Sequence, residues 1–373
     1  MRQSIMLVDD NVTGDLRLLR AKHAIGCNLQ IIDIRNGAEP HHRSLLRMVL
    51  IVGWLVTQCL LTSFTRYRRL FRILGHKTPD SFFSGLPSCV RWLIRSARAG
   101  TVLKSLSRPN PPQLVYAHDL YCAVASVLTP PTPETALIYD THELQIHRNR
   151  KTGLARLMIE YALEQRVLQQ ATEVRVVNRA IVELMTQLYD MPATVLVEYN
   201  DHFTHHPTTI PPVSRRPVLV YVGRGVQGRR LELLDRPPTD VGFDVHAYLL
   251  GARLPTSISG QYWHYGPEQY EEHLLALARL VRCIMWCCVD TSSLSYQFAT
   301  PNKFFQALAA GIPIIASKGT YLAEIVQKYG IGVVFDGSNL PKVAQQVMSP
   351  LYAQWVAGTE TFRAKLRSGE IVI

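Results

Sequence analysis

The stretch PNKFFQALAAGIPIIAS, residues 301–317, predicts a helix that is followed at once by a buried strand. Pro301 suits the first helical position, Thr300 is placed to cap it, and Gly311 permits a left-handed exit. Lys303 does not suit this position, because the amino end of a helix favours anions and repels a lysine. A bound phosphate would remove that conflict, so the stretch predicts an anion site at a helix terminus.

Around this stretch, strand-like and helix-like segments alternate. They read VLVYVGR, FDVHAYLLG, QYWHYGP, EQYEEHLLALARLVR, CIMWCCV, TYLAEIVQKYG and IGVVFD. Alternation of this kind is typical of a parallel sheet with helices on both faces. We therefore predict a doubly wound α/β domain over 218–345, with a helical segment over 346–373.

The first half of the chain has the same pattern. Its segments are SIMLVDD, GDLRLLRAKHAIG, CNLQIIDI, QLVYAHD, LYCAVASVL, TALIYDTHE, a helical pattern over 152–170, TEVRVVN, a helix over 179–189 and TVLVEYN. They predict a Rossmann-like domain over 1–207, in which 40–110 is a variable basic and apolar region. Residues 201–217 hold four prolines and no apolar period, which is typical of a linker. We expect two doubly wound domains whose strand ends face across a cleft.

Composition narrows the class of partner. The chain has 373 residues, 47% of them hydrophobic, and 40 Lys+Arg against 29 Asp+Glu give a formal charge of +11. The positive charge favours an anionic partner, but the arginines are scattered without interleaved aromatic residues, which counts against nucleic acid. The seven cysteines include no CxxC pair, so we expect neither a zinc site nor disulfides, as in a reducing cytosol. MRQSIMLVDDN has too short an apolar run for a signal peptide.

The segment MVLIVGWLVTQCLLTSF, residues 48–64, carries no charge and is flanked by arginines on both sides. Three interpretations are open: a buried helix, a helix lying on anionic lipid, and a membrane-spanning helix. We favour the helix on anionic lipid, which predicts a cytoplasmic protein, peripheral on the inner face of the cell membrane.

Cations follow a strand of the second domain. The loop YVGRGVQGRR contains Arg224, Arg229 and Arg230. Taken alone, such a loop is as well explained as a solvated surface. If Lys303 lies at the same edge of the sheet, these cations and the helix terminus converge where a diphosphate can bind.

Helical spacing places Asn302, Lys303 and Gln306 on one polar face. It turns Phe304, Phe305 and Leu308 toward the core. Gln306 is then placed to hydrogen-bond a sugar hydroxyl beyond the phosphates.

Two strands of the first domain end in titratable residues. YAHD provides His118, and YDTHE provides Asp140, His142 and Glu143. A lone histidine at a strand end is more often structural, but two of them, each beside carboxylates, favour a catalytic interpretation.

These motifs, in this order, resemble family 4 glycosyltransferases of the GT-B fold that build bacterial polysaccharides. The resemblance rests on DNVTGDLRLLRAKHAIG, VYAHDL, IYDTHEL, EYALEQRVLQQATEVRVVNRAI, VEYN, YVGR, YGPEQYEEHLLALARL and the opening stretch. It implies retaining, metal-independent transfer of a hexosyl group from a nucleotide-sugar, which we expect to be UDP-linked, to a lipid-linked or saccharide acceptor. No cofactor is implied.

The resemblance also implies roles for individual residues. Arg224 with Arg229 or Arg230 would hold the donor diphosphate, with Lys303 close by. Asn302, Gln306 and Asn200 of VEYN complete the expected donor site. His118 would close over the donor sugar, and His142, with Asp140 and Glu143, would lie on the acceptor side.

Three features depart from the family pattern. Gln306 and Phe298 stand where relatives have glutamates, and the C-terminal YAQWVAGTETFRAKLRSGEIVI is short for the helix that crosses back to the first domain. Two alternatives therefore stay open: a degenerate member that binds nucleotide-sugar or membrane without turnover, and a nucleotide-sugar epimerase of the same fold.

Overall fold

The computed structural model describes residues 4–8, 21–22, 24–26, 29–35, 50, 52–59, 67–74, 81–107, 111–129, 132–141, 143–146, 148, 153–191, 195–197, 215–225, 228–234, 238–249 and 270–373. The chain divides into two compact units, Met1–Glu198 (unit 1) and Tyr199–Ile373 (unit 2). The predicted linker, 201–217, lies outside the described residues up to 214, so its limits stay a prediction.

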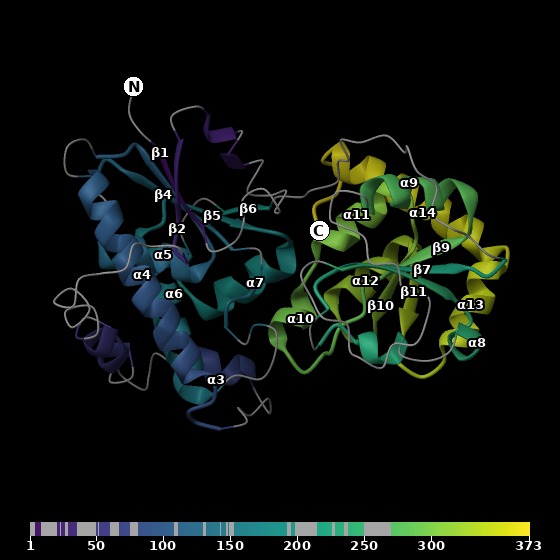
Figure 1. Ribbon diagram of the computed structural model, residues 1–373, viewed down its shortest axis with the longest axis horizontal. Helices are drawn as coiled ribbons and strands as arrows, with labels where there is room; N and C mark the ends of the chain where they lie inside the picture. The colour runs from purple at the N-terminus through teal and green to yellow at the C-terminus, as the bar shows by residue number, and fades with distance from the viewer. Residues whose placement is uncertain are drawn as a thin grey trace. The chain divides into compact units, whose positions relative to one another are not determined.

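Unit 1 is built on a parallel six-stranded sheet of order β2-β1-β3-β4-β5-β6 (Figure 1). Strands β1, β3 and β4 are largely apolar and buried, as expected when both faces of a parallel sheet are covered, whereas β5 alternates charged and apolar residues. The strands are β1 Ser4–Val8, β2 Leu29–Asp33, β3 Leu114–His118, β4 Ala136–Asp140, β5 Glu173–Val176 and β6 Val195–Val197. In the β3–β4 register His118 is opposite Asp140, so two of the predicted catalytic residues end neighbouring strands.

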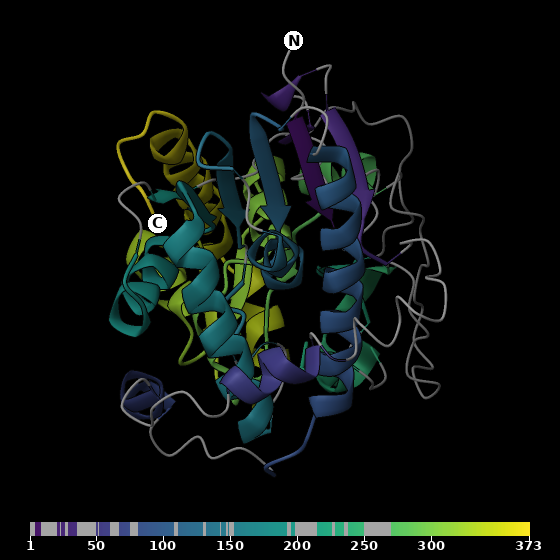
Figure 2. The same cartoon turned by 90° about the vertical axis from the view of Figure 1, so that its left-hand side faces the viewer.

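The helices of unit 1 cover this sheet. They are α3 Arg68–Leu74, α4 Leu86–Ser107, α5 Leu120–Leu128, α6 Leu154–Gln170 and α7 Arg179–Leu188. Helix α5 packs on β1 and β3 and contacts both α4 and α6. Helix α4, the long blue helix of Figure 2, runs alongside the strands. The predicted helical patterns over 152–170 and 179–189 are thereby confirmed as α6 and α7.

Within the predicted membrane-facing segment 48–64, the structure describes residues 50 and 52–59, which are helical. Val52, Leu55 and Cys59 are buried, whereas Leu50 and Trp54 are 65% and 61% exposed. The interpretation of this segment as a fully buried helix therefore does not fit the exposure of Leu50 and Trp54. Among the helices that the structure describes, none is long and apolar enough to cross a membrane.

Unit 2 has a parallel five-stranded sheet of order β11-β10-β9-β7-β8. Its strands are β7 Val218–Gly223, β8 Asp244–Leu249, β9 Cys283–Trp286, β10 Ile314–Ser317 and β11 Gly332–Phe335. Its helices are η3 Leu231–Leu234, α8 Pro238–Val241, α9 Tyr270–Leu280, α10 Leu294–Phe298, α11 Asn302–Ala310, α12 Tyr321–Tyr329, α13 Leu340–Met348 and α14 Leu351–Arg367. The predicted segment QYWHYGP lies outside the described residues.

Successive residues of β7 belong to different hydrophobic clusters. Val218 and Val220 pack with the apolar face of α11, whereas Leu219 and Tyr221 pack with η3 and α13. The sheet is thus covered on both faces, and the predicted doubly wound α/β architecture is confirmed.

Helix α11 ends as predicted, at Gly311 with a φ of 74°. Its predicted start is wrong by one residue. Pro301, with extended backbone, takes the N-cap position. Thr300 therefore lies one residue before the N-cap position.

A buried carboxylate in unit 1 is held by two tyrosines. The hydroxyls of Tyr139 and Tyr189 donate to Oε1 and Oε2 of Glu164 at 2.7 and 2.6 Å. Burial raises the pKa of Glu164 to about 7, although both hydrogen bonds act in the opposite direction. Glu164 therefore binds its proton more tightly in the folded chain than in the unfolded chain.

This predicts a pH-dependent stability. Because folding raises the pKa of Glu164, its contribution to the unfolding free energy is fully present below pH 4.5 and is lost as the pH rises through about 7. The loss amounts to about 3 kcal/mol. Thermal unfolding followed from pH 4.5 to 8 should show a steeper decline in wild type than in Glu164→Gln. Parallel curves would contradict the prediction.

Candidate active site

The ammonium group of Lys303 lies against an aromatic ring. Its Nζ is 3.8 Å from the centroid of the Tyr221 ring, and the Lys303 side chain is buried. Burial, and then the nearby Arg229, lower the pKa of Lys303 to about 7. Within the described part of the chain no carboxylate pairs with it. The charge of Lys303 is thus supported by a π face that does not neutralise it.

Tyr221 itself is fixed from the other end of its ring. Its hydroxyl donates to the backbone oxygen of Arg224 at 2.6 Å, and burial raises its pKa to about 12. Tyr221 is the fourth residue of β7, and Arg224 follows the end of this strand. One tyrosine therefore links the exposed Arg224 loop to the buried lysine of α11.

A second tyrosine supports a second cation. The guanidinium carbon of Arg229 is 4.8 Å from the centroid of the Tyr296 ring. The backbone near Arg229 is held by Trp286, whose Nε1 donates to the Arg229 oxygen at 3.0 Å. Close packing extends to Gly228, where a Cβ would come within 2.6 Å of Tyr296 Cε2. Arg229 lies close enough to Lys303 for its positive charge to disfavour the charged form of the lysine.

A pocket of about 580 Å³ opens beside these residues of the β7–η3 connection. Gly228, Arg230, Glu232, Asp290 and Thr291 line it. Arg230 has a φ of 52°, which is uncommon for a residue with a side chain. Arg230 therefore reaches this pocket from a constrained backbone.

The predicted faces of α11 are confirmed for its apolar side, since Phe304, Phe305 and Leu308 are fully buried. On the polar side, Asn302 is exposed and Gln306 is half-buried. The predicted roles of these two residues toward a donor stay predictions.

In unit 1, His118 and Asp140 are both buried at the carboxyl ends of their strands. The Tyr116 hydroxyl donates to Asp140 Oδ2, and the Arg175 guanidinium carbon is 5.6 Å from the centroid of the Tyr116 ring. Asp140 is thus engaged with a neighbour on β3. The sheet register brings His118 and Asp140 together, and their predicted catalytic roles stay predictions.

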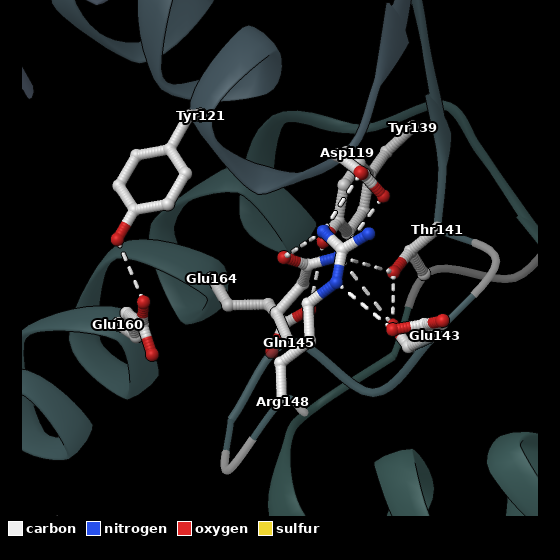
Figure 3. A network of polar contacts seen from close by, with 9 residues as sticks. All are labelled: Asp119, Tyr121, Tyr139, Thr141, Glu143, Gln145, Arg148, Glu160 and Glu164. Carbon is white, nitrogen blue, oxygen red and sulfur yellow. Dashed lines mark hydrogen bonds and ion pairs between the residues drawn. The ribbon is translucent and has the colours of Figure 1, made fainter. Parts of the chain in front are cut away.

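A polar network surrounds the residues that follow β3 and β4 (Figure 3). Arg148 Nη1 is 2.8 Å from Asp119 Oδ2, and Arg148 Nε is 2.9 Å from Glu143 Oε2. Gln145 Nε2 donates to Asp119 Oδ1 at 3.0 Å. Glu143, predicted as catalytic, is therefore an ion-pair partner of Arg148.

Two predicted site residues, His142 and Asn200, lie outside the described residues. Sequence reasoning missed Tyr221, Tyr296 and Arg148. For Tyr221 the sequence does contain a local signal, because this residue lies three positions before Arg224 in a strand whose side chains alternate between the two faces of the sheet. The contacts of Tyr296 with Arg229 and of Arg148 with Asp119 have no comparable signal, because these partners are distant in the sequence.

Across the described ranges, no group of three or more His, Cys, Asp or Glu side chains is placed to hold a metal ion. The metal-independent reaction that the sequence implies stays a prediction.

Comparison with known proteins supports the fold. Residues 287–372, which include α11 and Lys303, match the family model "Glucosyltransferase 3-like, C-terminal domain". Anabaena Alr3699/HepE, solved in complex with UDP and glucose, is 14% identical over 98% of this chain and 95% of that chain, with a TM-score of 0.61. The chain has the GT-B fold of glycosyltransferases.

Two other GT-B structures agree. Sucrose-phosphate synthase from Thermosynechococcus elongatus is 13% identical over 74% of this chain and 73% of that chain, with a TM-score of 0.57. WaaG, a glycosyltransferase involved in lipopolysaccharide biosynthesis, is 13% identical over 72% and 78%, with a TM-score of 0.53. No match was found among curated protein sequences.

The contact between Lys303 and Tyr221 can be tested by the binding of UDP, the nucleotide in the HepE complex. Tyr221→Leu should weaken UDP binding about 10- to 30-fold, because a desolvated cation–π contact is worth about 2 kcal/mol. Tyr221→Phe keeps the ring and should cost less than about threefold. Calorimetry at pH 6, where Lys303 is charged, measures both. Equal losses in the two variants would mean that the hydroxyl, rather than the ring, matters.

Proposed function

We propose that this protein is a glycosyltransferase that moves a hexosyl group from a UDP-sugar to a lipid-linked or saccharide acceptor, with retention and without a metal ion. The observation that carries the proposal is Lys303, a buried cation over Tyr221 with no carboxylate partner among the described residues. A site built in this way is stabilised by an anion. The glucosyltransferase family match over 287–372 includes this lysine.

The chemistry explains why the site needs several cations. Transfer breaks the bond between the anomeric carbon and the β-phosphate oxygen, which leaves negative charge on the nucleoside diphosphate. Lys303 and Arg229 are positioned on aromatic rings, and Arg224 and Arg230 lie on the same connection after β7. Fixed positive charge stabilises the departing diphosphate in a site shielded from water. We assign these residues to the donor diphosphate.

In unit 1 we assign His118 to the donor sugar, and Asp140 and Glu143 to the acceptor side. His118 is buried at the end of β3, where ligands of parallel α/β sheets bind. His118→Ala should therefore lower turnover more than it lowers UDP affinity, since the lost contact serves the transition state.

The donor assignment is tested by thermal shift and calorimetry with UDP, GDP, ADP and their sugars, with and without EDTA. A ligand that binds only the native state raises its stability. We expect selective stabilisation by UDP and UDP-sugars that EDTA does not remove. Lys303→Ala and Arg224→Ala should each weaken binding by about 1–3 kcal/mol.

Lys342→Ala is the matched control, because Lys342 is an exposed lysine in the first turn of α13. It should leave UDP affinity unchanged. Stabilisation by none of the nucleotides would refute the donor site. Binding without release or transfer of labelled sugar would favour the degenerate alternative that Gln306 and Phe298 suggest. Conversion of the free donor without acceptor would favour the epimerase.

We further propose that unit 1 rests on an anionic membrane surface, which suits a lipid-linked acceptor. Among the helical residues 50 and 52–59, Leu50 and Trp54 are exposed. The Tyr67 hydroxyl donates to the Cys59 carbonyl and so connects these residues with the start of α3. Arg68 and Arg72 on α3 are exposed. Apolar side chains beside arginines are typical of helices that lie at a membrane interface.

Vesicle co-sedimentation tests this surface. Trp54→Ala should reduce binding to phosphatidylglycerol-containing vesicles at least about fivefold, since a large apolar side chain no longer enters the lipid. Raised salt should weaken wild-type binding. Leu280→Ala, which removes an exposed apolar side chain from α9 in unit 2, is the control and should have no effect. Equal binding of wild type and Trp54→Ala would contradict the proposal.

A further inference from the structure

Asp119 has a backbone conformation that residues with side chains rarely adopt. Its φ is 67° and its ψ is 165°, directly after His118 at the end of β3. Its amide still donates to the Asp140 oxygen at 2.9 Å, so the β3–β4 pairing continues through the unusual residue. Such a conformation persists only where surrounding contacts impose it, and it is found preferentially at functional sites.

The carboxylate of Asp119 is bound by two side chains of one segment. Asp119 is buried, and its two carboxylate oxygens are bound by Gln145 Nε2 at 3.0 Å and Arg148 Nη1 at 2.8 Å. Both partners follow β4. Figure 3 shows the Arg148 guanidinium between the side chains of Asp119 and Glu143. Side chains of the connection after β4 are therefore attached to the residue that follows β3.

Arg148 makes a second bond that only a guanidinium can combine with the first. Its Nε is 2.9 Å from Glu143 Oε2 while Nη1 is 2.8 Å from Asp119 Oδ2. A planar guanidinium offers two donors in fixed directions, whereas a lysine offers a single charged atom. Within segment 141–146, the Thr141 hydroxyl also donates to the Glu143 oxygen at 2.7 Å. The bonds of Arg148 with Asp119 and Glu143 thus connect the residue after β3 with the segment after β4, and we call this pair of bonds the bracket.

We propose that Arg148 is a positioning residue for the transfer reaction. By binding Asp119 and Glu143 at once, it holds the backbone of Asp119 in its unusual conformation, and so sets the orientation of His118 and of the segment after β4. The proposal rests on the proposed function for its catalytic consequence, but the bracket itself has a readout without substrate.

That readout is hydrogen–deuterium exchange of the full chain. In Arg148→Lys, which keeps the positive charge, amides of 141–146 should exchange at least about tenfold faster than in wild type, while α6 is unchanged. The matched control is Arg156→Lys, because Arg156 pairs with Glu160 on α6 at 2.7 Å in a similarly buried place of the same unit. It should leave 141–146 as in wild type. Unchanged exchange in Arg148→Lys would overturn the proposal.

The catalytic consequence is tested by steady-state release of labelled sugar from a UDP-sugar. Arg148→Lys should lower kcat at least about tenfold with UDP affinity within twofold, and Arg156→Lys should leave both unchanged. A kcat within twofold of wild type for Arg148→Lys would overturn the positioning role. Wild type without turnover would instead refute the proposed function, and exchange would still decide whether the bracket exists.

A double-variant cycle separates positioning from stability. Glycine adopts the Asp119 conformation without strain and has no carboxylate to hold. In an Asp119→Gly background, Arg148→Lys should therefore change kcat less than twofold, although it costs at least tenfold in wild type. Equal costs in both backgrounds would show that Arg148 does not act through Asp119.

Discussion

A buried ammonium group above an aromatic ring is the constraint on which the arrangement of unit 2 depends. Lys303 is held 3.8 Å from the centroid of Tyr221, and no carboxylate among the described residues neutralises it. Desolvation disfavours the charged form, which is why the pKa of Lys303 falls to about 7. A carboxylate would have stabilised the lysine but would have cancelled its charge. The ring supports the cation and leaves the charge for a ligand.

Two other elements of unit 2, β7 and α11, bring this lysine and its partners together at the edge of the sheet. Strand β7 brings Tyr221 and Arg224, and α11, whose apolar residues pack on the sheet, brings Lys303. Pro301 takes the N-cap position of α11, and the positive end of this helix adds to the charge of Lys303. Unit 1 uses the same parallel architecture differently. There, the residues after β3 and β4 bring the carboxylates of Asp119 and Glu143 together around Arg148.

The sequence predicted much of this, and the failures have physical causes. The bounds of the strands and of α11 follow from apolar runs, Pro301 and Gly311, which are local signals. Lys303 was singled out because it conflicts with the helix dipole. Thr300 was assigned as a cap because the extended conformation of Pro301 was not foreseen. The contacts of Tyr221 with Lys303, of Tyr296 with Arg229 and of Arg148 with Asp119 were missed because each joins residues far apart in the sequence. The positive φ of Asp119 was not predicted either.

Proton uptake on ligand binding tests the central claim most directly. At pH 8, Lys303 with a pKa of about 7 is roughly 90% neutral, and a diphosphate beside it raises that pKa. Calorimetry of UDP binding in two buffers of different ionisation enthalpy should therefore show uptake of close to one proton per site in wild type. In Lys303→Met, where UDP still binds, it should show almost none. Binding of UDP to wild type without proton uptake, or with the same uptake in both proteins, would contradict the account.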